Sequence, residues 1–163
     1  MRYSGIIFND VTAAPGLCVT LFTQGCPHRC PGCHNPDTWD FEGGHEFTIS
    51  TLHSIITGLT AQGIQRNLCI MGGEPLCSEN SYLTSMVVTA VKQQVPEAKI
   101  YVWTGYTYER LLEIDCPHIN TVLALSDYLI DGPYVDALRD ITLPMRGSSN
   151  QRIIDLSEKN NII

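Results

Sequence analysis

The sequence predicts an α/β fold in which a mainly parallel sheet forms a partial, open (βα) barrel. Short apolar runs rich in β-formers alternate with longer segments whose apolar residues recur at helical spacing. This alternation is typical of parallel sheets with helical crossovers. At about 30 residues per βα unit, the 163 residues suffice for roughly four to six units, too few to close an eight-stranded barrel.

The expected strands are short, and most are apolar enough to be buried. They cover residues 2–9, 17–23, 67–71, 99–104, 127–131 and 152–155. The first contains the run Ile6-Ile7-Phe8 and is a strand-like arm, and the last lies in a C-terminal part with weaker periodicity. No internal repeat, low-complexity segment or linker interrupts the series.

Helices are expected over residues 48–59, 81–95 and 107–114, and a shorter apolar segment covers 122–125. Thr48 or Ser50 can cap the first of these helices and Thr107 the third, because a hydroxyl accepts a hydrogen bond from a free backbone N–H. Pro96 stops the second helix, since proline has no N–H to continue it.

The cysteine-rich and glycine-rich segments each follow directly on a predicted strand. They are residues 24–33, 72–75, 104–106 and 131–134. The carboxyl ends of parallel strands share one edge of the sheet, and active sites of α/β proteins lie there. We therefore expect these four segments to meet and to form the functional site.

Composition restricts the functional class. A formal net charge of -7 argues against nucleic acid or an anionic membrane as a partner, because phosphates would not be neutralised. The chain has neither a signal-peptide core nor an apolar run near the roughly 18 residues of a membrane span. We expect a single cytoplasmic domain over residues 1–163. Its seven cysteines fit metal ligation and free thiols better than disulfides.

Cys26, Cys30 and Cys33 form a C-x3-C-x2-C loop immediately after a predicted strand. A cluster of four irons takes four ligands, so three thiolates leave one iron open to bind a substrate. Two other interpretations remain at this point. Together with His28 or His34 the cysteines would make a tetrahedral zinc set, and a fourth thiolate such as Cys77 would make a ferredoxin-like electron carrier.

Combined with Gly72-Gly73-Glu74-Pro75, the cysteine loop resembles the radical S-adenosylmethionine superfamily. Within it, the chain looks like the family of activating proteins of anaerobic ribonucleoside-triphosphate reductase from about Ile6 to Arg152. The segments that carry this closer resemblance are Gly25-Cys26, residues 30–33, Asn35, Thr38-Trp39, residues 102–106, Asp131-Gly132 and residues 146–151.

The resemblance implies that Cys26, Cys30 and Cys33 bind three irons of a 4Fe-4S cluster, while the amino and carboxylate groups of S-adenosylmethionine chelate the fourth. It implies further cosubstrate contacts. Gly72 and Gly73 would approach the methionine moiety, and Glu74 would accept a hydrogen bond from its amino group. Gly32, Cys33 and His34 would pass near the adenine. Apart from the resemblance, Thr104 and Tyr106 either line the cosubstrate pocket or belong only to a strand-end turn that needs Gly105.

The implied activity is oxidoreductase chemistry. One electron from the reduced cluster cleaves S-adenosylmethionine, and the 5'-deoxyadenosyl radical takes hydrogen from a glycine of the reductase large subunit, leaving a glycyl radical. A flavodoxin or ferredoxin is the implied electron donor. Activation of another glycyl-radical enzyme, or a small-molecule radical reaction, is the alternative within this chemistry, and a non-catalytic zinc module is the alternative outside it.

Some features are left without a single role. An arginine common in the family is absent from the segment at Leu17 and Cys18, which puts its contact in doubt. Cys77 is a buried thiol or a further ligand, and Asp131 is a ligand contact or only a polar strand end. Residues 146–152 either dock the partner or form a solvated loop.

Overall fold

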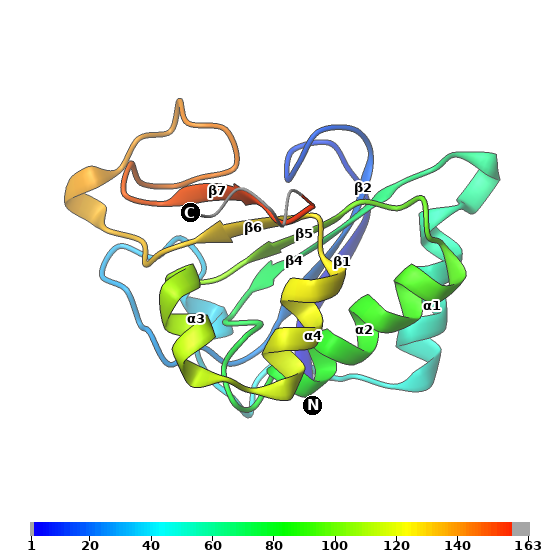
Figure 1. The fold of residues 1–163 in the computed structure, drawn as a ribbon, viewed down its shortest axis with the longest axis horizontal. Coiled ribbons are helices and arrows are strands. Elements are labelled where there is room, and N and C mark those ends of the chain that lie inside the picture. The colour runs from blue at the N-terminus through cyan, green and yellow to red at the C-terminus, as the bar shows by residue number, and fades with distance from the viewer. Residues whose placement is uncertain (1, 158–163) are drawn as a thin grey trace.

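The computed structural model describes residues 2–157 (Figure 1). Met1 and residues 158–163 of the expected domain therefore lie outside the described residues. Seven strands form one sheet in the order β3-β1-β2-β4-β5-β6-β7. They are β1 (Arg2–Asp10), β2 (Cys18–Thr23), β3 (His45–Glu46), β4 (Asn67–Gly72), β5 (Ile100–Trp103), β6 (Tyr128–Asp131) and β7 (Arg152–Asp155).

The core of the sheet is parallel and its two edges are antiparallel. Strands β2, β4, β5 and β6 pair in parallel. At one edge β1 runs antiparallel to both β2 and β3, and at the other β7 runs antiparallel to β6. The first and last strands in this order do not pair, so the sheet stays open. The prediction of a partial, open barrel with a mainly parallel sheet is confirmed.

Four helices lie together on one face of the sheet (Figure 1). They are α1 (Ile49–Leu59), α2 (Ser81–Gln94), α3 (Tyr108–Ile114) and α4 (Pro117–Leu125). Of the two candidates for the cap of α1, the hydroxyl of Thr48 makes the hydrogen bond, and that of Thr107 caps α3 as expected. The prediction of only a short apolar segment at 122–125 was wrong, because α4 begins at Pro117. Proline is tolerated in the first turn, where its missing N–H has no helical partner.

None of the described helices has the length and apolarity needed to cross a membrane.

Alternation along the strands divides the core into two clusters. On β4, Leu68 and Ile70 belong to the large cluster beneath the helices, whereas Cys69 belongs to a smaller cluster on the opposite face. On β5, Ile100 faces the helices in the same way and Tyr101 the opposite face. A period of two is the rule for side chains along a strand. The smaller cluster lies beneath the site described next.

Candidate functional site

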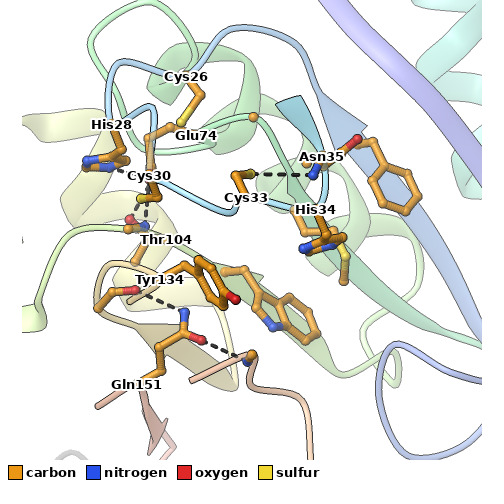
Figure 2. Close-up of a pocket in the computed structure, with 18 of the residues that line it drawn as sticks. Cys26, His28, Cys30, Cys33, His34, Asn35, Glu74, Thr104, Tyr134 and Gln151 are labelled. Atoms are coloured by element: carbon orange, nitrogen blue, oxygen red, sulfur yellow. Dashed lines mark hydrogen bonds and ion pairs between the residues drawn. The ribbon is translucent and has the colours of Figure 1, made fainter. Parts of the chain in front are cut away.

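A cavity of about 380 Å³ lies at the carboxyl edge of the parallel strands. Residues from the loops after β2, β4, β5 and β6 all line it, which confirms that the four segments meet. Figure 2 shows the three cysteines on one side of this cavity and Tyr134 and Gln151 on the opposite side. Of the residues expected at the site, the lining includes Cys26, Cys30, Cys33, His34, Gly72, Gly73, Glu74 and Thr104.

Gly32 is the one expected site residue that does not line this cavity. Its φ of +74° is in the left-handed region, and a Cβ there would lie 2.6 Å from Oδ1 of Asp136. Glycine is therefore needed at position 32 by the backbone conformation and by the approach of Asp136. The C-terminal segment thus packs directly on the cysteine loop.

The cysteine loop is held by backbone hydrogen bonds at its start and by a sulfur contact at its end. The N–H of Gly25 donates to the Thr38 carbonyl at 2.8 Å, and the N–H of Asn35 donates to Sγ of Cys33 at 3.4 Å. Burial raises the pKa of the Cys26 thiol. Among residues 2–157 no three His, Cys, Asp or Glu side chains converge as the ligands of one ion would. Thiolates of a four-iron cluster bind different irons and need no such convergence.

Glu74 joins three of the loops that form the cavity. Its side chain is buried. One carboxylate oxygen accepts from the N–H of Leu76 at 2.9 Å and from the hydroxyl of Thr104 at 2.8 Å. The other accepts from the N–H of Gly105 at 2.7 Å and faces Nε2 of His28 at 2.9 Å. A carboxylate has about four acceptor positions, and this one uses them within the protein.

His28 is fixed against the loop that follows β5. Its ring contacts the ring of Tyr106 edge to face, with centroids 4.5 Å apart. A Cβ on Gly105 would lie 2.5 Å from Cδ2 of His28, so the imidazole occupies the space that any other residue at 105 would need. Its Nε2 is engaged by Glu74. His28 therefore serves to tie the cysteine loop to Glu74.

The backbone conformation and the close packing of two loops require glycine at positions 72 and 73. The N–H of Gly73 donates to the Thr23 carbonyl and that of Glu74 to the Gly25 carbonyl, both at 2.8 Å, so parallel pairing continues beyond the ends of β2 and β4. A Cβ on Gly73 would lie 2.4 Å from the Gly25 oxygen. Gly72 has a φ of +102°. Both glycines thus let the two loops dock closely.

Asn80 was missed by sequence reasoning. Its buried side-chain amide donates to the carbonyls of Gln24, Gly25 and Glu74, at 3.0, 3.2 and 3.0 Å. Immediately before α2, an asparagine is typical of a helix cap. Its side chain makes no cap hydrogen bond; it joins the loops after β2 and β4. Sequence pattern alone offers no signal for this second use.

Residues 132–151 form the opposite wall of the cavity and are tightly folded. Oε1 of Gln151 accepts from the N–H of Gly147 at 2.9 Å and from that of Ser148 at 3.2 Å, while its Nε2 donates to the Gly132 carbonyl at 3.0 Å. Arg146 and Gln151 line the cavity. Residues 146–151 therefore belong to the site, a role that the sequence left open.

Asp131 and Cys77 lie beside the site but do not line the cavity. The buried Asp131 carboxylate accepts from Nε of Arg152 at 3.0 Å and from the N–H of Tyr108 at 2.7 Å, so it joins β6 to β7 and α3. The Cys77 thiol donates to the Glu74 carbonyl at 3.2 Å. Burial raises the pKa of Cys77 to about 12.

The comparisons with known proteins agree with this geometry. A family model described as a 4Fe-4S single cluster domain matches residues 13–154. Proteins named anaerobic ribonucleoside-triphosphate reductase-activating protein are similar over nearly their whole length. The relative from Enterobacteria phage T4 is 37% identical over 94% of this chain and 93% of its own. The relative from Vibrio cholerae serotype O1 is 38% identical over 94% of this chain and 97% of its own length. The relative from Escherichia coli (strain K12) is 38% identical over 93% of this chain and 96% of its own length.

The chain belongs to the family of anaerobic ribonucleoside-triphosphate reductase-activating proteins. The resemblance carried by the cysteine loop and Gly72-Gly73-Glu74-Pro75 is thereby confirmed, and so is the expected 4Fe-4S cluster. Leu17 and Cys18, the segment where an arginine was expected, precede and begin β2. Neither Leu17 nor Cys18 lines the cavity.

Proposed function

We propose that this protein activates anaerobic ribonucleoside-triphosphate reductase by generating a glycyl radical on its large subunit with a 4Fe-4S cluster and S-adenosylmethionine. The observation that carries the proposal is the meeting of three cysteine thiols with the loop Gly72-Gly73-Glu74 in one cavity. Membership of the activating-protein family supports it, as does the match to a 4Fe-4S domain.

The donor set fits a cluster with one iron free of protein ligands. Cys26, Cys30 and Cys33 line the cavity and would hold three irons. Cys77 would have to be the fourth ligand of an electron carrier, but it lies outside the lining and is engaged by the Glu74 carbonyl. When bound, the reduced cluster supplies the electron for reductive cleavage of S-adenosylmethionine.

The cavity also fits a cosubstrate with apolar and polar parts. Trp39, Met71 and Trp103 contribute large side chains to its lining, which exclude water from the reacting atoms. We propose that Gly72 and Gly73 present backbone groups to the methionine moiety, and that the backbone of residues 32–34 lies near the adenine.

Glu74 takes a different role in this proposal from the one the resemblance implies. Because its two oxygens already accept from Leu76, Thr104 and Gly105 and face His28, an amino group would have to displace one of these partners. We propose that Glu74 is a positioning residue, which fixes the cysteine loop against Thr104 and Gly105.

We further propose a flavodoxin or ferredoxin of the cytoplasm as electron donor. The experiment that tests the function combines the reconstituted protein, the reductase large subunit, S-adenosylmethionine and a one-electron reductant without oxygen. A glycyl radical on the reductase is expected by electron paramagnetic resonance, together with methionine and 5'-deoxyadenosine. Cys30→Ser should give none of these. Cleavage of S-adenosylmethionine without a radical on the reductase would favour another glycyl-radical enzyme or a small-molecule substrate.

A further inference from the structure

Arg146 is the only lysine or arginine among the described residues that lines the cavity. Its Nε is buried and has no hydrogen-bond partner within residues 2–157. Arg66 differs in that its Nε is paired: this buried guanidinium donates to Oδ1 of Asn9 and to the carbonyls of Ala61 and Ile64. Buried donors are normally paired, so an unpaired guanidinium N–H at a cavity wall indicates a ligand.

The free side of Arg146 has the geometry of a carboxylate site. Nη1 donates to the Gln151 carbonyl at 3.3 Å, which fixes the guanidinium at one corner. The edge formed by Nε and Nη2 makes no hydrogen bond in the described part of the chain. Two parallel N–H groups on one edge match the two oxygens of a carboxylate.

The backbone before Arg146 is held in an uncommon conformation. Met145 has a φ of 58°, in the left-handed region, and its carbonyl accepts from Nε1 of Trp103 at 2.7 Å. Trp103 ends β5 and also lines the cavity. Strained residues persist where surrounding contacts hold them, and they cluster at ligand sites. This bond between β5 and the C-terminal wall sets the start of the Arg146 side chain.

No carboxylate of residues 2–157 forms an ion pair with Arg146. None of the ion pairs within residues 2–157 includes it. Asp140 lies in the same segment, and hydrogen bonds from Thr142, together with the charge of Arg146, lower the pKa of its carboxyl. Asp140 and Arg146 form no ion pair, however, and Oδ1 of Asp140 accepts from the N–H and hydroxyl of Thr142, at 2.9 and 2.6 Å. A carboxylate within hydrogen-bond distance of Arg146 would therefore come with a ligand.

We propose that Arg146 binds the α-carboxylate of S-adenosylmethionine. This inference rests on the proposed function, which places that cosubstrate in the cavity. The carboxylate is the only anionic group of S-adenosylmethionine, whose sulfonium and amino groups are the wrong partners for a guanidinium. In a cavity whose lining includes Trp39 and Trp103, a carboxylate needs hydrogen-bond donors, and the Nε–Nη2 edge of Arg146 would supply them. Arg146 thereby fixes the orientation of the cosubstrate and selects for its carboxylate.

The test compares S-adenosylmethionine with its decarboxylated analogue on anaerobically reconstituted protein, with affinities from calorimetry. Arg146→Gln should weaken binding of S-adenosylmethionine roughly tenfold or more, the usual effect of a lost hydrogen bond to a charged group. Binding of the decarboxylated analogue should stay within about twofold, since it lacks the group that Arg146 contacts. Arg139→Gln is the matched control, because Arg139 is exposed in the same segment and does not line the cavity.

Arg146→Lys, which keeps the charge but lacks the planar fork, should recover part of the preference for the carboxylate. Equal losses for both ligands, or an unchanged preference in Arg146→Gln, would overturn the inference. So would a loss of affinity for the reductase with normal binding of S-adenosylmethionine, since Arg146 would then contact the polypeptide. Wild-type protein that binds neither small molecule would overturn the proposed function itself.

Discussion

The two walls of the cavity differ in how completely their polar groups are paired. On the cysteine-loop wall, the oxygens of Glu74 have partners in three loops. Asn80 does not line the cavity, but its amide joins two of the loops that do by donating to three carbonyls. On the C-terminal wall, Arg146 keeps an unpaired Nε, and Met145 is in the left-handed region.

The difference separates two tasks. A buried polar network that is fully satisfied is rigid, which suits a wall that must hold three thiols for one cluster. A wall with an unpaired N–H donor can bind a ligand whose acceptor groups pair with that donor. The comparison predicts that substitutions on the first wall change stability, whereas substitutions of Arg146 change ligand binding.

The largest effect is expected for Glu74→Gln. An amide presents one acceptor oxygen and one NH2 group, so donors such as the N–H of Gly105 would face another donor. We expect a loss of about 3 kcal/mol or more in the free energy of unfolding, measured by urea denaturation of the iron-free protein. Glu97→Gln is the control, since Glu97 is exposed. A near-neutral Glu74→Gln would contradict the structural role of this carboxylate.

A matched pair of arginine substitutions tests whether pairing inside the protein decides the loss of stability, since Arg66 is paired away from the cavity and Arg146 has an unpaired Nε at its wall. Arg66→Met should cost about 2–4 kcal/mol, because it strands the acceptors that Arg66 satisfies. Arg146→Met should stay within about 0.5 kcal/mol, since it removes one long hydrogen bond and one unpaired donor. The same denaturation measurement serves for both. Equal losses would mean that Arg146 is structural.

Gly105→Ala should cost about 1–3 kcal/mol, because its Cβ would displace the His28 ring. The double variant with His28→Ala removes the obstructing ring, so its loss should be smaller than the sum of the two single losses. The unfolding free energies of the wild type, the two single variants and the double variant form a double-mutant cycle. Strict additivity would mean that His28 and Gly105 are not coupled.

The smallest effect concerns pH. Arg152 forms ion pairs with both Glu109 and Asp131. Its hydrogen bond to Glu109 lowers the pKa of that carboxyl to about 2. Because the folded pKa lies below the unfolded value near 4.5, this stabilisation is present above that value and is lost as pH falls towards 2. Melting temperatures measured from pH 5 to pH 2 should fall less steeply for Glu109→Gln. Parallel curves would show that the contact adds nothing.

The sequence predicted the parts that depend on local pattern. The last strand matches its predicted range, 152–155, because its residues and flanking turns are a local signal. The position of the cavity followed from the rule that strand ends share one edge. The antiparallel edges at β1 and β7 could not be predicted, since a strand's composition does not encode its direction.

The internal partners of the site residues could not be predicted either. Glu74 meets His28 and Thr104 across 46 and 30 residues of chain, and no local pattern encodes such contacts. Arg146 was left between two interpretations, because only the folded cavity shows which of its N–H groups lacks a partner.

The central claim is that three cysteines hold a cluster whose open iron binds S-adenosylmethionine. The most direct measurement is low-temperature electron paramagnetic resonance of the reduced, anaerobically reconstituted protein, with and without S-adenosylmethionine. The signal of the reduced cluster should change when the cosubstrate is added, in the wild type and in Cys77→Ser alike. A cluster signal indifferent to S-adenosylmethionine, or a protein that takes up zinc in place of a cluster, would contradict the claim.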